Sequence, residues 1–300
     1  MRHTERFAPS PTGPLHLGHA FSALTAWQAA RDAGGRFLLR MEDLDESRST
    51  PGFAAQIESD LHWLGIDWDG PVLEQSSRRA AYDAALKALS AEGLLYPCTC
   101  SRRDIREAAG APQEGAPAGL DGTIYPGTCR PAAAITAPVP PPPGAALRLD
   151  MRRALGRLEA PLAYTEAGPV HPAEHPVVPE RLLSEAGDVV LARRDGAAAY
   201  HLAVVVDDAY QGVTHVTRGA DLFSATPLHR LLQALLRLPV PVWHHHRLIR
   251  DSHGRRLAKR DDARSLETLQ AEGWSPQDVR TAVGLGSGAS LDHDPFDPPD

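Results

Sequence analysis

RFAPSPTGPLHLGH, residues 6–19, is the stretch that decides how this chain folds. Its prolines and its glycine exclude a regular helix or strand across the turn. After it, Ala20, Leu24 and Trp27 begin a run of apolar residues at three- and four-residue steps, which ends at Gly34-Gly35. This spacing predicts a helix that starts directly after the turn. His16 and His19 therefore lie where that helix begins.

The start of a helix is a natural place for an anion. Its first turn offers unpaired backbone N–H groups and the positive end of the helix dipole. A phosphate-bearing ligand is therefore expected beside His16 and His19. The alternative is a pair of surface histidines that cap the helix, which is disfavoured by Gly18 between them and by the rigid turn before them.

Composition places the chain among soluble globular proteins. It has 300 residues, of which 42% are hydrophobic and 23% charged, enough for one or two domains. No apolar run reaches membrane-spanning length and no signal-peptide core follows the N-terminus, so we expect a cytoplasmic monomer without a membrane partner. The formal net charge of −7 excludes a non-specific basic coat. A nucleic-acid partner must therefore meet a local basic face.

The pattern of elements predicts an α/β fold with a parallel sheet. A strand over residues 36–41 ends in Glu42, and helices follow over residues 53–64 and 82–89. Ligands bind beyond the carboxyl ends of such strands, so Glu42 is expected beside the turn. The β-branched run at residues 199–206 predicts a second central strand, which ends in Asp207-Asp208. A further strand is predicted at residues 213–217, followed by a helix that begins at Pro227.

The segment between the two halves of the sheet has a different character. Cys98 and Cys100 lie two residues apart on an extended segment and so point the same way. Cys129 returns after a long Ala/Gly-rich loop. Three thiolates and one further ligand would complete a tetrahedral zinc site. The alternative is three ordinary free cysteines.

Two further segments carry candidate chemistry. His244-His245-His246 suggests a metal site, but neighbours on a strand alternate faces, so ordinary packing is favoured. RRLAKR, residues 255–260, is a basic loop that suits phosphate binding or simple solvation. Lys259 is one of two lysines among 31 basic residues, which favours a functional role. Residues 264–283 are predicted to be helical, and residues 287–300 to be a frayed tail.

Taken together and in this order, these segments resemble a class I aminoacyl-tRNA synthetase of the glutamyl type. The turn at residues 6–19 is similar to that family's first signature in its glutamate-specific form. RLAKR, residues 256–260, lies where the second signature, KMSKS, belongs. The resemblance covers residues 4–262 and implies a Rossmann-type catalytic domain.

The resemblance implies a role for each site residue. Mg²⁺ would share the phosphate charge while a glutamate carboxylate attacks the α-phosphorus of ATP. The residues implied for ATP binding and catalysis are His16, Gly18, His19 and Lys259. Those implied for glutamate binding are Arg6, Phe7, Ala8, Pro9, Ser10, Glu42, Tyr200 and Arg218.

We expect no anticodon-binding domain in the forty residues that follow the second signature. The chain therefore resembles the truncated paralogues, the glutamyl-queuosine tRNA(Asp) synthetases. Tyr125 matches the tyrosine zinc ligand of that family, which implies one structural Zn²⁺ held by Cys98, Cys100, Tyr125 and Cys129. We expect a catalytic half at 1–97, an inserted zinc-containing subdomain at 98–187, a second catalytic half at 188–262, and a helical segment with tail at 263–300.

The resemblance implies that the enzyme activates L-glutamate with ATP and transfers it to queuosine in the anticodon loop of tRNA(Asp). One alternative is a truncated enzyme that charges tRNA(Glu), and another is a small-molecule nucleotidyltransferase. A third is a non-catalytic paralogue that only binds tRNA or glutamate. Arg256 and Ala258 motivate the last, because they replace a lysine and a serine of the second signature.

Overall fold

The computed structural model describes residues 2–109, 118–120, 122–249 and 264–286. Its first sheet is parallel, as the sequence predicts: β1 (Thr4–Phe7) pairs with β2 (Arg36–Met41), and β2 pairs with β3 (Leu73–Glu74). Both β1 and β2 are almost fully buried, because helices cover them.

The second half of the sheet follows much later in the chain. β11 (His215–Gly219) and β12 (Val242–His246) are parallel, which confirms the predicted strand near residues 213–217. β12 also pairs with β8 (Ala163–Glu166), and β9 (Ala173–Pro176) is antiparallel to β8. The mixed sheet thus ends in a hairpin.

The two halves meet along β1 and β11, and side chains form several of the hydrogen bonds between these strands. The backbone N–H of Thr214 donates to the Thr4 carbonyl at 3.0 Å, and the Thr4 N–H donates to the Thr214 hydroxyl at 2.8 Å. Further along, the Thr217 N–H and hydroxyl both donate to the Glu5 carboxylate. A buried carboxylate needs such donors, so Glu5 and Thr217 hold the two strands together.

Three helices of the first half form where the sequence predicts them. They are α1 (Leu17–Asp32), α2 (Pro51–Trp63) and α3 (Arg79–Ala91). The Thr50 hydroxyl caps α2 by accepting from the Phe53 N–H, and Pro51 occupies the first turn, which are typical start signals. Gly34, Gly65 and Gly93, just beyond the three helices, have positive φ.

The predicted central strand at residues 199–206 is wrong: this run forms the helix α7 (Tyr200–Gln211). Seven of its residues are buried, on most faces of the helix. A helix buried all round loses the 3.6-residue pattern and resembles a buried strand. Asp207 and Asp208 therefore lie inside the last turns of a helix, which Gly212 ends in a left-handed conformation.

The later helices complete the two main cores. α8 (Thr226–Leu235) has Pro227 in its first turn, as predicted. The predicted helical stretch at residues 264–283 is two helices, α9 (Leu266–Ala271) and α10 (Pro276–Ala282), because Gly273 has a φ of 85° and Ser275 caps α10. Leu266, Leu269 and Val279 are buried in one core with residues of β1, β2, α1 and α2.

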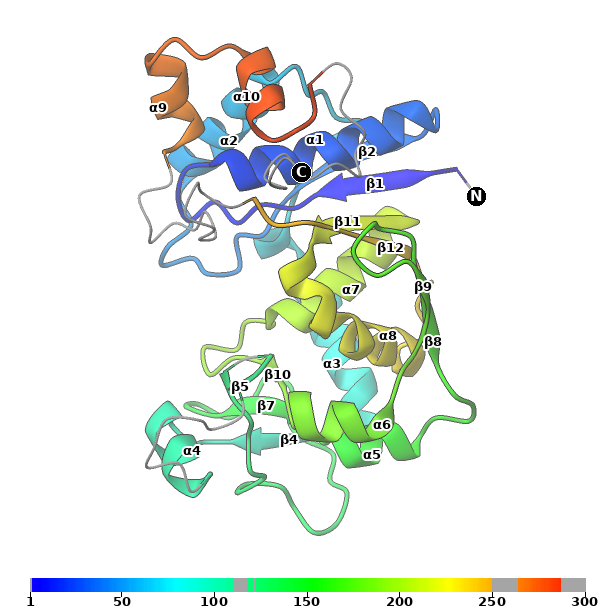
Figure 1. Ribbon diagram of the computed structural model, residues 1–300. Coiled ribbons are helices and arrows are strands. Elements are labelled where there is room, and N and C mark those ends of the chain that lie inside the picture. Colours follow the sequence, from blue (N-terminus) through cyan, green and yellow to red (C-terminus); the bar gives the residue numbers. More distant parts are fainter. Residues whose placement is uncertain (1, 110–117, 121, 250–263, 287–300) are drawn as a thin grey trace.

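A separate antiparallel sheet lies at the other end of the molecule (Figure 1). Its central strand is β7 (Ala146–Leu149), flanked by β4 (Leu95–Cys98) and β10 (Val190–Ala192). The predicted domain limits at residues 97 and 187 stay a prediction. β8 lies inside the predicted insertion but pairs with β12, and β10 lies outside it but pairs with β7.

The remaining elements of the described residues are short. They are η1 (Gln75–Arg78), α4 (Arg102–Ala108), β5 (Ala118–Gly119), β6 (Gly122–Thr123), α5 (Met151–Gly156), α6 (Pro179–Arg181), η2 (Leu182–Ala186) and η3 (Ala220–Ala225). Within the described part of the chain, every helix is too short or too polar to cross a bilayer.

Candidate active site

A cavity of about 620 Å³ opens where the signature turn, the start of α1 and the end of β11 meet. Of the twelve residues that the sequence analysis assigns to glutamate and ATP, eleven line this cavity. They are Arg6, Phe7, Ala8, Pro9, Ser10, His16, Gly18, His19, Glu42, Tyr200 and Arg218. The twelfth, Lys259, lies outside the described residues.

The two histidines build the predicted helix start. His16 is the N-cap of α1: its Nδ1 accepts from the Gly18 N–H at 3.1 Å, and His19 Nδ1 accepts from the His16 N–H at 3.2 Å. The two rings stack with their centroids 3.8 Å apart. This reciprocal cap fixes both imidazoles at the cavity, beside the positive end of α1.

Gly18 makes this arrangement possible for a steric reason. A Cβ atom at this position would lie 3.0 Å from Cε1 and 3.2 Å from Nδ1 of His16. Contacts this short would require the His16 ring, and with it the cap, to shift by a few tenths of an ångström. The glycine between the two histidines therefore serves the close approach of a ring to the backbone.

Four charged side chains at one wall balance each other, and of these Arg6 and Glu42 line the cavity while Arg40 and Asp208 lie behind it. Arg6 Nε lies 3.1 Å and Arg40 Nη1 lies 2.8 Å from the same Oδ1 of Asp208. Arg40 Nη2 also lies 3.6 Å from Glu42 Oε1. Two guanidinium groups thus face two carboxylates, and Arg6 donates a further hydrogen bond to the Thr217 carbonyl. Buried charges are tolerated when they are paired in this way.

The two carboxylates of this group differ in proton affinity. Burial raises the pKa of Glu42 above its usual range, and nearby Arg40 and Arg6 only partly oppose this effect. Burial also acts to raise the pKa of Asp208, but Arg6 and Arg40 outweigh it and lower the value. Asp208 is therefore a firmly ionised anchor, and Glu42 is the more responsive group beside the cavity.

Sequence reasoning missed several side chains of this wall. Arg40 and Asp208 hold Arg6 in place, but they come from β2 and from a helix that was predicted as a strand. His246 and Asp221 also line the cavity. Of these residues, only Arg40 could have been found from the sequence, because a charged residue inside an apolar strand needs a partner.

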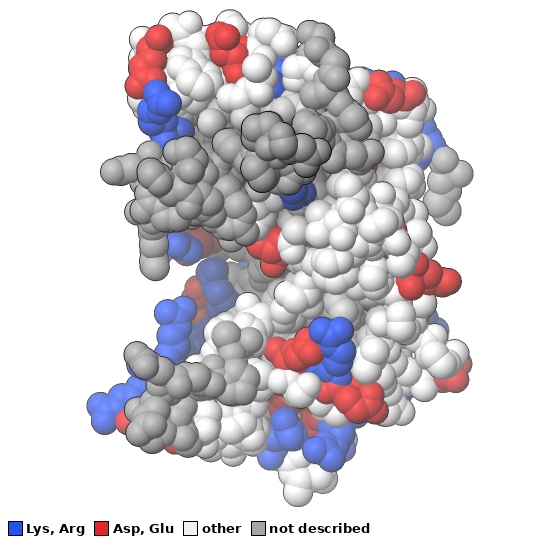
Figure 2. All heavy atoms as spheres, in the orientation of Figure 1, with Lys and Arg blue, Asp and Glu red and all other residues white. Residues whose placement is uncertain are grey.

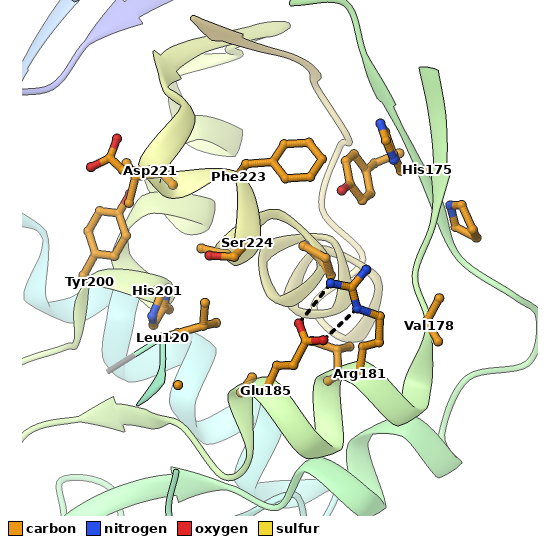
Figure 3. A pocket seen from close by; sticks show the side chains of 18 residues that line it. Leu120, His175, Val178, Arg181, Glu185, Tyr200, His201, Asp221, Phe223 and Ser224 are labelled. Atoms are coloured by element: carbon orange, nitrogen blue, oxygen red, sulfur yellow. Dashed lines mark hydrogen bonds and ion pairs between the residues drawn. The ribbon is translucent and has the colours of Figure 1, made fainter. Parts of the chain in front are cut away.

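A second cavity, of about 700 Å³, adjoins the first and shares three lining residues with it: Tyr200, Asp221 and Leu222. Figure 3 shows Tyr200 and Asp221 on one side, with Phe223 and His175 across from them. The rings of His175 and Phe223 meet edge to face at 5.3 Å. Arg181 and Glu185 form an ion pair at the wall. Aromatic rings with a few polar groups are typical of a ligand pocket.

The predicted metal ligands converge at the end of β4. The sulfurs of Cys98, Cys100 and Cys129 all lie within 4.8 Å of one another. The Tyr125 hydroxyl lies 3.5 Å from Cys98 Sγ and 3.6 Å from Cys100 Sγ. Sulfurs around a tetrahedral zinc ion are about 3.8 Å apart, so three thiols and a phenol oxygen are compatible with zinc.

The environment of this cluster favours a thiolate at Cys129, whereas burial raises the pKa of Cys100. Burial acts to raise the pKa of Cys129, but hydrogen bonds with the Tyr125 hydroxyl and the Thr99 backbone outweigh it and lower the pKa to about 7. The guanidinium of Arg148 lies 3.9 Å from the Tyr125 ring centroid. This positive charge stabilises electron density on the ring.

One buried carboxylate holds the cluster against the antiparallel sheet. Asp188 accepts from the Tyr96 hydroxyl, from Arg130 Nε at 2.6 Å and from the Met151 N–H at 3.0 Å. Arg130 is next to Cys129 in the chain, so this contact fixes the returning loop. Among the described residues, the histidines at 244–246 belong to no comparable cluster of ligands.

The sequence comparisons agree with this geometry. The catalytic-domain model of class I tRNA synthetases (E and Q) matches residues 3–119 and 177–289. A glutamyl-Q tRNA(Asp) synthetase of Rhodobacter capsulatus is 58% identical over 93% of this chain and 99% of its own length. One of Symbiobacterium thermophilum is 43% identical over 98% of this chain and 89% of its own length.

The structural comparison agrees on the fold. A glutamate tRNA ligase from Elizabethkingia meningosepticum, solved with its amino acid, superposes with a TM-score of 0.73 at 24% identity. The match covers 98% of this chain and 63% of the ligase, so the chain spans less than two thirds of that protein. The family model and the sequence relatives identify the chain as a member of the class I synthetase family for glutamate and glutamine, in the group of the glutamyl-Q tRNA(Asp) synthetases.

Proposed function

We propose that the chain activates L-glutamate with ATP and transfers the glutamyl group to queuosine in the anticodon loop of tRNA(Asp). The observation that carries this proposal is the convergence of the predicted glutamate and ATP residues on one cavity. The names of the sequence relatives support the choice of acceptor.

The cavity suits an adenylate-forming step. A carboxylate oxygen of glutamate attacks the α-phosphorus of ATP, the bond to the bridging oxygen breaks, and pyrophosphate leaves with its electron pair. Arg6 and Arg218 are suited to the carboxylates of the amino acid and Glu42 to its ammonium group. The N-terminus of α1 with His16 stabilises charge at the α-phosphate. We assign Lys259 to the departing pyrophosphate, whose charge Mg²⁺ shares.

The second cavity is suited to the acceptor. Tyr200 and Asp221 line both cavities, so a nucleoside in the second cavity would lie next to the activated carboxyl group. Phe223 and His175 offer rings on which a base can stack. Figure 2 shows Lys and Arg side chains along a hollow of the molecular surface, a local basic face that suits an RNA backbone despite the acidic net charge.

We further propose that Cys98, Cys100, Tyr125 and Cys129 hold one structural Zn²⁺. Among the described residues, the apolar cluster at these groups is small: Tyr96, Cys98 and Tyr125, with Ile105 packed against them. A metal would supply the cross-link that so small a core lacks.

The acceptor is tested by charging tRNA(Asp) with and without queuosine side by side, using labelled glutamate. We expect label only on the queuosine-containing RNA, and equal labelling of both would contradict the proposal. Label at the terminal ribose of tRNA(Glu) would favour the truncated tRNA(Glu) enzyme instead. Absence of glutamate-dependent ATP–pyrophosphate exchange would favour a non-catalytic paralogue.

A further inference from the structure

Arg218 is held in a way that sets it apart from the other arginines of the cavity. Its Nε donates to His245 Nε2 at 2.9 Å, and its Nη1 bonds His229 Nδ1 at 3.1 Å. Its Nη2 donates to the Thr226 hydroxyl at 2.9 Å and to the Leu222 carbonyl at 3.2 Å. All four partners are uncharged acceptors when the histidines are neutral.

The hydrogen bonds themselves require neutral histidines. A guanidinium only donates, so the facing nitrogens of His245 and His229 must carry lone pairs. The proton of His245 then lies on Nδ1, which faces the buried carboxylate of Glu166. His229 in turn bonds His201 through Nε2, at 3.0 Å. Burial also lowers the pKa of both His245 and His229, which keeps them neutral.

The contrast with Arg6 and Arg40 shows what this arrangement achieves. Those two arginines each contact Asp208 directly, so their charge is already matched. No carboxylate oxygen from the described ranges lies within 4.0 Å of a guanidinium nitrogen of Arg218. Asp208 acts on Arg218 only from a distance, and the Glu166 carboxylate reaches it only through His245, which it contacts at Nδ1 and at the backbone N–H.

We infer that His229, His245, Thr226 and Glu166 are positioning residues that keep the charge of Arg218 available to the side-chain carboxylate of the amino acid. This inference rests on the proposed function and names the source of its selectivity. An anionic substrate gains an ion pair because no carboxylate of the described residues contacts the guanidinium. A neutral isostere such as glutamine gains only a weaker hydrogen bond. The pocket therefore prefers glutamate.

Two pairs of variants test the inference at different nitrogens of Arg218. His229→Glu puts a carboxylate beside Nη1, and His229→Gln is its neutral control. Thr226→Asp puts one beside Nη2, at the first position of α8 where an acid is tolerated, and Thr226→Ser is its control. The KM values for glutamate and for ATP are measured by ATP–pyrophosphate exchange, with glutamine as a competitive inhibitor.

Both acidic variants should raise the KM for glutamate by about 10- to 100-fold, the loss expected for a charge-assisted contact. The two controls should stay within about threefold of the wild type. The KM for ATP should change little in all four, and the preference for glutamate over glutamine should fall only in the acidic pair. Melting curves identify a variant that does not fold, in which case the other pair decides.

Equal KM values for glutamate in an acidic variant and its neutral control would overturn the inference. An equal rise in the KM for ATP would also overturn it, because that result indicates general damage to the cavity. A wild type without glutamate-dependent exchange would instead contradict the proposed function. The two failures are therefore distinguishable.

Discussion

The activation cavity and the cysteine cluster are built on different principles. The cavity is enclosed by parallel strands and a capped helix, and its Arg6 and Glu42 are matched by Asp208 and Arg40 behind them. The cluster lies on loops around a small apolar core, and its four donor atoms point at one another. The first arrangement is held together by ion pairs and hydrogen bonds between side chains, whereas the second would gain most from a bound metal. Stability and chemistry are therefore separable by mutation in this molecule.

In the activation cavity, we expect the largest effect from Lys259→Ala. Losing the cation assigned to pyrophosphate should lower the rate of ATP–pyrophosphate exchange by about 100- to 1,000-fold. The affinity for glutamate and the melting temperature should stay unchanged. Lys87→Ala is the matched control, because Lys87 is the other lysine and is exposed on α3. An unchanged rate for the Lys259 variant would remove the assigned role.

The next largest effect is expected in the cysteine cluster. Cys100→Ser should lower bound zinc and cost about 4 kcal/mol of folding stability, the size expected for loss of a metal site. That corresponds to roughly 10 °C in melting temperature, while the KM for glutamate should stay near the wild-type value.

Thr99→Ala is the control for this variant, because Thr99 is exposed between the two cysteines. Metal content is measured by mass spectrometry, and melting curves are recorded with and without a chelator. A wild type that contains no zinc and melts identically with chelator would contradict the metal proposal.

A smaller effect is expected in the second cavity, which adjoins the activation cavity. Phe223→Ala should slow transfer to tRNA by about tenfold, the loss typical of one stacked base. Exchange should fall by a smaller factor than transfer, because Phe223 lines only the second cavity and touches the activation cavity only through the His245 ring. Leu183→Ala, an exposed neighbour on η2, is the control. If exchange and transfer fell by the same factor, the two cavities would not divide the reaction as proposed.

The smallest expected effect is a pH dependence of stability inside the cavity region. Burial lowers the pKa of His246 to about 4, and its Nε2 has no hydrogen-bond partner within the described part of the chain. The unfolded chain therefore binds the proton more tightly, and stability falls as the pH drops from about 6.5 to 4. His246→Asn should reduce this slope by about 1 kcal/mol per pH unit, measured by urea unfolding. Parallel profiles for both proteins would contradict the assignment.

Local signals explain what the sequence could predict. The turn before α1, its capping histidines and the glycines after three helices depend on neighbours within a few residues. The run at residues 199–206 was mistaken for a strand because burial on most sides removed its helical pattern. Spacing alone could not pair Arg6 with Asp208, which lies 202 residues away. Tyr125 was predicted from family resemblance only, and its hydroxyl does lie beside the cysteine sulfurs.

The packing of α9 and α10 has a consequence for how the protein is made. Leu266, Leu269 and Val279 share a core with residues between Phe7 and Ile66. The ribosome must therefore add about 200 residues after the early part of this core has emerged, which takes about 10–40 s at ordinary rates of synthesis. During that time the apolar surface of α1 and α2 stays partly uncovered, which makes the nascent chain a natural client for chaperones.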